Sequence, residues 1–348
     1  MDTSTLRTPK QLLEAGMIDA GDLDGISRVA GQFAVSISGQ MRALIDGTAP
    51  NDPIAAQFLP STLELQRTPE ELADPIGDET HSPTAGIVHR YPDRVLFKLT
   101  SACPVYCRFC FRRETVGKSA GALDELEIEQ ALRYIESNPQ IWEVVLSGGD
   151  PLILSKRRLK SIMRRLEAIE HVGVIRFHTR VPVVQPETID AGLIDALKIS
   201  KAVYVVLHTN HARELSPAAR SACARLIDSG FPMLSQTVLL KGVNSDAQTL
   251  TALFRALVAM RIKPYYLHHG DLARGTSHFR TSIEEGQSLM TQLRGTVSGL
   301  CQPIYVLDIP GGHGKVPIGP NYLSRTDDGK ITVNDIHGRP HPYPSGGS

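Results

Sequence analysis

The sequence lacks long apolar stretches and any excess of charge of one sign. No apolar run approaches the roughly 20 residues that cross a bilayer, so no membrane-spanning helix is predicted. The chain carries 37 Lys and Arg against 37 Asp and Glu, and its formal net charge is zero. Neither nucleic acid nor a membrane is therefore expected as a partner. The first residues, MDTSTLRTPKQLLEAG, show no basic segment followed by an apolar one, so no signal peptide is expected.

Cysteines are few, odd in number and clustered. Of five in 348 residues, three lie together as Cys103, Cys107 and Cys110. A secreted disulfide framework would be denser and spread along the chain. Clustered thiols in a reducing cytoplasm more often bind metal, so a cytoplasmic location is expected. Cys223 and Cys301 are isolated and are predicted to be core thiols.

The chain changes character near residue 90. Residues 1–70 show short amphipathic helices, and the Pro-, Asp- and Thr-rich stretch 68–92 is predicted to be a linker or a wrapping loop. Strands then alternate with amphipathic helices. The candidate strands are 94–100, 142–148, 173–179, 202–208, 232–240 and 264–269, and the clearest helices are 123–138, 155–169 and 246–260.

Six strand–helix units with apolar strands predict an α/β fold with a parallel sheet buried on both faces. A closed eight-unit barrel needs about 250 residues, and the repeat region has only about 205, so a partial (βα)6 barrel fits better. Its active site should lie at the C-terminal ends of the strands. We expect an N-terminal helical region with linker (1–88), the barrel (89–300) and a C-terminal segment (301–348) that closes the open side.

The loop after the first of these strands, LTSACPVYCRFCFRR, has the spacing C-x3-C-x2-C. Three thiolates suit three irons of a [4Fe–4S] cluster and leave the fourth iron free to bind S-adenosylmethionine (SAM). The alternatives are a structural zinc site or a chance grouping. Zinc usually takes four ligands, often as two pairs, and no second pair is present.

Two glycine-rich segments add to this pattern. The segment SGGD (147–150) ends the second strand and lets backbone approach a ligand closely, although GGD is also a common turn. The segment PGGHGK ends in Lys315 and is not a Walker motif, because Val316 follows the lysine. It is a phosphate-binding turn, a surface loop, or a site where lysine bonds pyridoxal phosphate (PLP).

From about residue 70 to 325 the chain resembles lysine 2,3-aminomutases of the radical SAM superfamily. The matching segments are VHRYPDRVLFKLTSACPVYCRFCFRR, EVVLSGGDPL, SQTVLLKGVN, PYYLHHGDL and DIPGGHGKVPIGPNY. The resemblance implies a [4Fe–4S] cluster, SAM and PLP on a partial barrel. It also implies conversion of L-lysine to β-lysine by a 5′-deoxyadenosyl radical, and an external electron donor such as flavodoxin or ferredoxin. The sequence is compatible with a homo-oligomer but does not define its geometry.

The resemblance assigns roles residue by residue. Cys103, Cys107 and Cys110 match the cluster ligands, Lys315 the PLP lysine, Arg90 and Arg94 the phosphate ligands, and Tyr91 a residue that packs on PLP. Ser147, Gly148, Gly149, Asp150, His208 and Gln236 match positions near SAM, Arg112 the partner of the substrate α-carboxylate, and Asp271 and Asp308 the partners of its ε-ammonium. The alternatives are surface ion pairs, loop carboxylates and core polar residues. His178 and His268 are interpreted as structural.

The chain departs from the clostridial enzymes in two places. His313 stands where they usually have glycine, and the longer tail with zinc-binding cysteines is missing, so no zinc is predicted. Short relatives include enzymes that supply (R)-β-lysine for modifying elongation factor P. The rival interpretations are an aminomutase for another amino acid, such as glutamate, and a non-catalytic metal-binding module. Two carboxylates at 271 and 308 favour a cationic substrate.

Overall fold

The computed structural model describes residues 4–47, 49, 51–117, 121–325 and 330–344. Within them, nine strands form one sheet in chain order. They are β1 (Ile87–Tyr91), β2 (Arg94–Thr100), β3 (Glu143–Gly148), β4 (Val174–Thr179), β5 (Ala202–His208), β6 (Met233–Val238), β7 (Lys263–His268), β8 (Ile304–Asp308) and β9 (Lys315–Pro317). Strands β2 to β8 are parallel, whereas β1 and β9 pair antiparallel at the two edges. The predicted α/β partial barrel is confirmed, with β8 as a seventh parallel strand.

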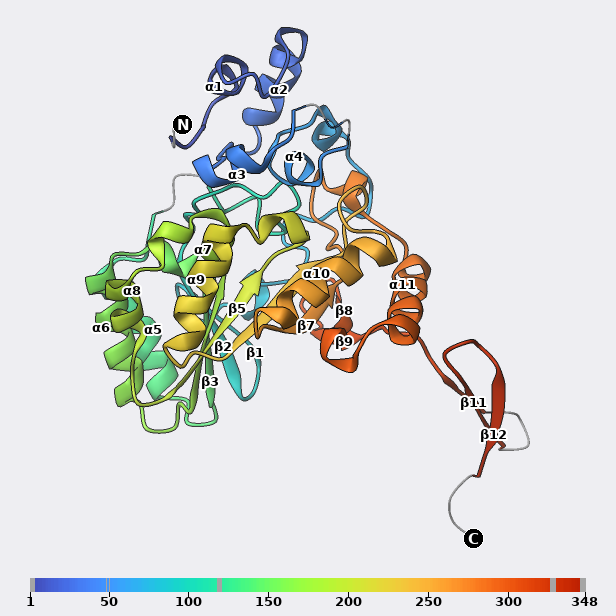
Figure 1. Cartoon of the computed structure of the whole chain (residues 1–348). Helices are drawn as coiled ribbons and strands as arrows, with labels where there is room; N and C mark the ends of the chain where they lie inside the picture. Colours follow the sequence, from blue (N-terminus) through green and yellow to red (C-terminus); the bar gives the residue numbers. More distant parts are fainter. Residues whose placement is uncertain (1–3, 48, 50, 118–120, 326–329, 345–348) are drawn as a thin grey trace.

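Helices cover the outer face of the curled sheet (Figure 1). They are α5 (Glu125–Glu136), α6 (Lys156–Ala168), α7 (Val181–Val184), α8 (Ala191–Leu197), α9 (Pro217–Asp228), α10 (Ala247–Ala259) and α11 (Ile283–Thr296). Helix α5 shows why they form where they do. Asp124 and Glu127 make a capping box, and Ile128, Leu132 and Ile135 bury one face at helical spacing.

Strand β1 was not predicted. Its residues fall in the stretch 68–92, which the sequence indicated was a linker or loop. The chain instead turns at Pro92 and Asp93, so that Tyr91 pairs with Arg94 and β1 adds to the edge of β2. The buried side chains of Ile87 and Val88 stabilise this pairing. The predicted division of the chain at residues 88 and 300 stays a prediction. The first strand of the sheet begins at Ile87.

The N-terminal region packs against the loop that carries the three cysteines. It contains α1 (Pro9–Glu14), α2 (Leu23–Ala30), α3 (Gly39–Leu44) and α4 (Pro53–Phe58). Backbone N–H groups of Tyr106 and Arg108 donate to the carbonyls of Ser36 and Gln57, at 2.8 and 2.9 Å. These helices therefore lie beside the C-terminal ends of the parallel strands, at one end of the barrel (Figure 1).

The predicted C-terminal segment (301–348) closes the sheet through its strand β9 and not through its tail. Strands β10 (Leu323–Arg325), β11 (Ile331–Asn334) and β12 (Pro340–Tyr343) form a separate antiparallel sheet that extends away from the barrel (Figure 1). The two edges of the large sheet are joined instead by Lys315 of β9, whose N–H donates to the hydroxyl of Tyr91 of β1 at 2.7 Å. No helix among the described residues is both long and apolar enough to cross a membrane.

Candidate active site

A cavity of about 650 Å³ opens at the C-terminal ends of the parallel strands. Every residue that the sequence assigned to a ligand contributes to its lining. These residues are Cys103, Cys107, Cys110, Arg90, Tyr91, Arg94, Ser147, Gly148, Gly149, Asp150, His208, Gln236, Arg112, Asp271, Asp308 and Lys315. Segments up to 225 residues apart thus face one space, which is the place where this architecture concentrates ligands.

The three clustered cysteines lie on the loop after β2. Burial raises the pKa of each thiol, that of Cys110 to about 11, so an uncompensated thiolate is disfavoured here. A positive metal centre supplies the missing compensation. Among the described residues, no three His, Cys, Asp or Glu side chains are grouped to hold a single ion. A [4Fe–4S] cluster would give each of the three thiolates its own iron.

Two arginines inside the cysteine loop are structural anchors. Arg108 donates through Nε and NH2 to the carboxylate of Glu64, at 2.9 and 2.5 Å, and Arg113 donates to the same carboxylate. All three side chains are almost completely buried. Removing one partner of such a group costs about 3–5 kcal/mol, because the remaining charge stays buried and unpaired. Glu64 therefore fixes the loop that carries the cysteines.

The SGGD segment brings the end of β3 against that loop. Gly148 has φ of 112°, and a Cβ on Gly148 or Gly149 would overlap the carbonyls of Thr100 or Ala102. Glycine is required by this close approach of two backbones. The Asp150 carboxylate accepts hydrogen bonds from Thr179 Oγ1 at 2.8 Å and from the N–H of Arg180 at 2.7 Å. Its side chain holds the end of β4, so any SAM contact here falls mainly to the backbone.

The glycine-rich loop folds β8 back into β9. Ile309 donates its N–H to the carbonyl of Gly314 at 2.8 Å, and Asp308 becomes the cross-strand partner of Lys315. Nζ of Lys315 reaches the Asp308 carboxylate and lies 3.1 Å from Nδ1 of His268. Burial alone would raise the pKa of Asp308, but His268 and Lys315 hold that pKa far below its usual range. The hairpin thus turns a lysine into the cavity.

His313 lies on the same loop but does not enter the cavity. Its side chain is exposed, while Gly312 and Gly314 on either side are buried. Gly312 packs on the stretch before β1, where its carbonyl lies 3.0 Å from Nε2 of His81. His313 is therefore not part of the cavity lining, whereas Lys315 is.

Asp78, which the sequence analysis did not single out, contacts three cationic side chains near β1. Asp78 accepts from Nε of Arg112 at 2.9 Å and pairs with Arg90 at 3.4 Å and Lys98 at 3.8 Å. Burial by itself raises the pKa of Asp78, but the three cations outweigh it and the pKa is lowered. The buried Nε of Arg90 has no partner among the described residues. This unsatisfied donor suits an anionic ligand.

Arg94 and Tyr91 form the rim of the same region. The Arg94 guanidinium lies 3.8 Å from the centroid of the Tyr91 ring and donates to Asp93 at 2.7 Å. The Tyr91 hydroxyl accepts a hydrogen bond from the N–H of Lys315, so Tyr91 and Arg94 lie next to the strand that carries the lysine, where β1 meets β9. Two arginines and a lysine facing one space suit a phosphorylated aldehyde cofactor.

Asp271 follows β7 and has no hydrogen-bond partner among the described residues. Burial and the nearby charge of Asp308 raise its pKa to about 7. A buried carboxylate beside another carboxylate is stabilised by an added cation. The pair therefore fits a ligand that brings an ammonium group.

His208 ends β5, and Gln236 is its cross-strand partner in β6, two residues before the end of that strand. The ring of His208 lies 5.6 Å from that of Phe109, and burial lowers its pKa well below the usual value. Its buried Nε2 has no partner among the described residues. A neutral imidazole with a free nitrogen in the cavity is available to a ligand.

Two family models match the chain. The Radical SAM superfamily matches residues 97–253, and Lysine-2,3-aminomutase matches residues 290–345. The L-lysine 2,3-aminomutase of Acetoanaerobium sticklandii is 40% identical over 315 residues, which are 90% of this chain and 76% of that protein. That of Bacillus subtilis is 34% identical over 342 residues, 98% of this chain and 73% of that protein.

The chain belongs to the lysine 2,3-aminomutase family. It is an isomerase of the radical SAM superfamily, and its family's cofactors are a [4Fe–4S] cluster, SAM and PLP. The glutamate 2,3-aminomutase of Clostridioides difficile is also similar, at 37% identity over 86% of this chain and 70% of that protein. A non-catalytic module is ruled out by this membership, while the amino acid that this aminomutase rearranges must be argued from the cavity.

Proposed function

We propose that this aminomutase converts L-lysine to β-lysine. The observation that carries the proposal is the pair Asp271 and Asp308 in the cavity, where the first carboxylate lacks a partner and has its pKa raised to about 7. The ε-ammonium of lysine has three donors and a positive charge, which match two carboxylates. Without such partners an ammonium in a closed cavity would lose several kcal/mol of hydration.

Other lining residues serve the opposite end of the substrate and the cofactors. Arg112, on the cysteine loop, would bind the α-carboxylate, and its Nε donates to Asp78, which supports this role by fixing the guanidinium. Lys315 is the residue that would bond PLP, with Arg90 and Arg94 on its phosphate. Ser147, Gly148, Gly149, Asp150, His208 and Gln236 border the space beside the cysteines, where SAM would lie. The cofactors supply the radical and the π-system through which an amino group migrates between neighbouring carbons.

A glutamate substrate fits the cavity less well. Its side chain would place a third carboxylate beside Asp271 and Asp308, which already repel each other. Each like-charge contact at low dielectric is unfavourable unless a proton is taken up. A glutamate-selective site would present a lysine, arginine or asparagine at one of these positions.

Product analysis tests the proposal. The enzyme, reconstituted anaerobically with iron, sulfide and PLP, is incubated with SAM, a reductant and either L-lysine or L-glutamate. We expect β-lysine from the first mixture and no β-glutamate from the second. Formation of β-glutamate in preference to β-lysine would reject the substrate and leave the family membership intact.

Two further proposals concern the setting of the reaction. An external low-potential one-electron donor, such as flavodoxin or ferredoxin, reduces the cluster. The β-lysine is used to modify elongation factor P, which the mass of that factor from cells with and without this enzyme would test. The homo-oligomer and the cytoplasmic location stay predictions.

A further inference from the structure

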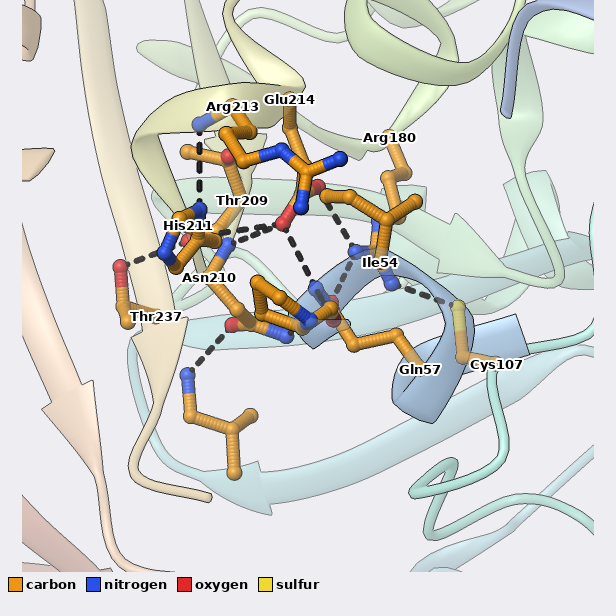
Figure 2. Close-up of polar contacts among 12 residues, drawn as sticks. Ile54, Gln57, Cys107, Arg180, Thr209, Asn210, His211, Arg213, Glu214 and Thr237 are labelled. Carbon is orange, nitrogen blue, oxygen red and sulfur yellow. Dashed lines mark hydrogen bonds and ion pairs between the residues drawn. The ribbon is translucent and has the colours of Figure 1, made fainter. Parts of the chain in front are cut away.

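Arg180 makes a direct contact with one of the three clustered cysteines. It follows β4, and its NH1 donates to Sγ of Cys107 at 2.9 Å (Figure 2). The residue is buried.

The position of this guanidinium is fixed from several sides. NH2 donates to Glu214 at 2.8 Å and to the side-chain oxygen of Gln57 at 2.5 Å. The guanidinium carbon Cζ also lies 4.7 Å from the ring centroid of Phe58 and 5.3 Å from that of Phe109. A side chain held by a salt bridge, an amide and two rings has little freedom to leave the sulfur.

Glu214 is fixed in turn by backbone after β5. Its Oε1 accepts from the N–H of Asn210 at 2.9 Å and of His211 at 3.0 Å, while Gln57 donates to it at 3.1 Å (Figure 2). The guanidinium of an arginine stays protonated in proteins, so this side chain carries a fixed positive charge. The ion pair therefore points its positive end at Cys107.

We propose that Arg180 is a positioning residue that raises the reduction potential of the cluster through its charged hydrogen bond to Cys107. Hydrogen bonds to cluster sulfurs and nearby charge are the main means by which a protein sets this potential. Reduction moves one electron from a low-potential donor to the cluster. No bond changes and no proton moves, so the cluster becomes one charge more negative and the donor is oxidised by one electron. A guanidinium at hydrogen-bonding distance stabilises the added charge strongly in a buried site.

The inference rests on the cluster at Cys107 and is independent of the substrate. It is tested by potentiometric titration of the reconstituted enzyme, followed by electron paramagnetic resonance (EPR) without SAM or amino acid. Arg180→Gln combined with Glu214→Gln removes both buried charges, which avoids an unpaired carboxylate. We expect the reduction equilibrium to weaken at least tenfold, which is a fall of about 59 mV for a one-electron couple.

A matched control removes a half-buried ion pair that joins β3 to β4. Arg176 of β4 pairs with Glu143 at 3.0 Å and contacts no cysteine of the loop. Arg176→Gln with Glu143→Gln should leave the potential unchanged. If the Arg180 and Glu214 double variant holds its full iron and sulfide content and keeps the parent potential, Arg180 is merely structural and the proposal is overturned.

A second measurement needs no variant and tests the contact on which the proposal depends, with the cluster bound. The enzyme is produced with arginine labelled by 15N only in the guanidinium, and the reduced cluster is studied by pulsed EPR. We expect a 15N hyperfine coupling, since NH1 of Arg180 lies 2.9 Å from Cys107 Sγ. Absence of that coupling overturns the proposal.

Discussion

Asp308 and Lys315 face each other across the β8–β9 hairpin, and the lysine Nζ donates to the aspartate carboxylate. Asp308 was assigned from the sequence to the substrate ammonium, so the free enzyme already holds an ammonium at that carboxylate. Bonding of Lys315 to PLP would draw its Nζ away from Asp308 and free that carboxylate for the substrate. Cofactor loading and substrate binding would thus share one residue.

The first prediction follows from the direction of Lys315. Because its Nζ lies in the cavity beside His268, borohydride reduction of the PLP-loaded enzyme should trap a pyridoxyl group on the peptide that contains Lys315. Lys315→Ala should lose the trapped group and the visible cofactor band. Lys241→Ala, at an exposed position, should retain both. A pyridoxyl group on any other lysine would disprove the assignment of the loop.

The second prediction concerns selection of the substrate. Asp271→Asn or Asp308→Asn should lower kcat/KM for L-lysine at least tenfold, which corresponds to about 1.4 kcal/mol. Asp271→Asn is the cleaner test, since Asp308 also holds Lys315. Cluster content and PLP content at saturating cofactor should not change. Asp195→Asn, on a surface ion pair with Lys160, is the control. Parent-like kcat/KM in both cavity variants would reject lysine as the matched substrate.

The third prediction is a pH dependence set by Asp271, whose pKa is raised to about 7 by burial and by Asp308. An unfolded Asp ionises near pH 4, so this group destabilises the free folded enzyme as pH rises from about 4 to 7. Bound lysine reverses the preference, because its ammonium favours the carboxylate. Lysine affinity should therefore fall about tenfold per pH unit below pH 7 and level off above it.

Binding titrations with the PLP-loaded enzyme at a series of pH values measure this slope. Asp271→Asn, which has no proton to release, should bind lysine more weakly but with a much flatter pH profile. A parent enzyme whose lysine affinity does not change between about pH 5.5 and 7 would show that Asp271 does not meet the ammonium.

The fourth prediction concerns the cluster. Cys107→Ala should abolish the brown cluster absorption and all SAM cleavage, because the remaining two thiols leave a second iron without a protein ligand. Cys223→Ala removes a buried thiol of helix α9 and should retain the cluster. Cluster absorption of parent intensity in the Cys107 variant would refute the assignment of the three cysteines.

The sequence revealed the repeating part of the fold well. Strand β2 was predicted with its observed bounds, and β5 likewise, because buried parallel strands form continuous apolar runs between turn residues. Strand β1 was missed because its last residues are polar and it follows a stretch rich in proline and aspartate. The Pro92–Asp93 turn between Tyr91 and Arg94 was the available signal for a hairpin.

The cavity residues that belong to short sequence motifs were predicted. The residues that support them from distant parts of the sequence were missed. Glu64 lies 44 residues before Arg108, and Asp78 lies 34 residues before Arg112, so no local spacing connects them. His268 was interpreted as structural, yet it lies 3.1 Å from Nζ of Lys315. Its place at the end of a parallel strand, three residues before Asp271, was the signal that it faces the cavity.

The measurement that tests the central claim most directly follows a hydrogen isotope. L-lysine carrying deuterium at C3 is incubated anaerobically with the reconstituted enzyme, SAM and a reductant, and the products are analysed by mass spectrometry and NMR. If a SAM-derived radical takes hydrogen from C3 and returns it after the amino group has moved, deuterium appears in 5′-deoxyadenosine and at C2 of β-lysine. β-Lysine with all its deuterium still at C3, or no β-lysine at all, would contradict the account.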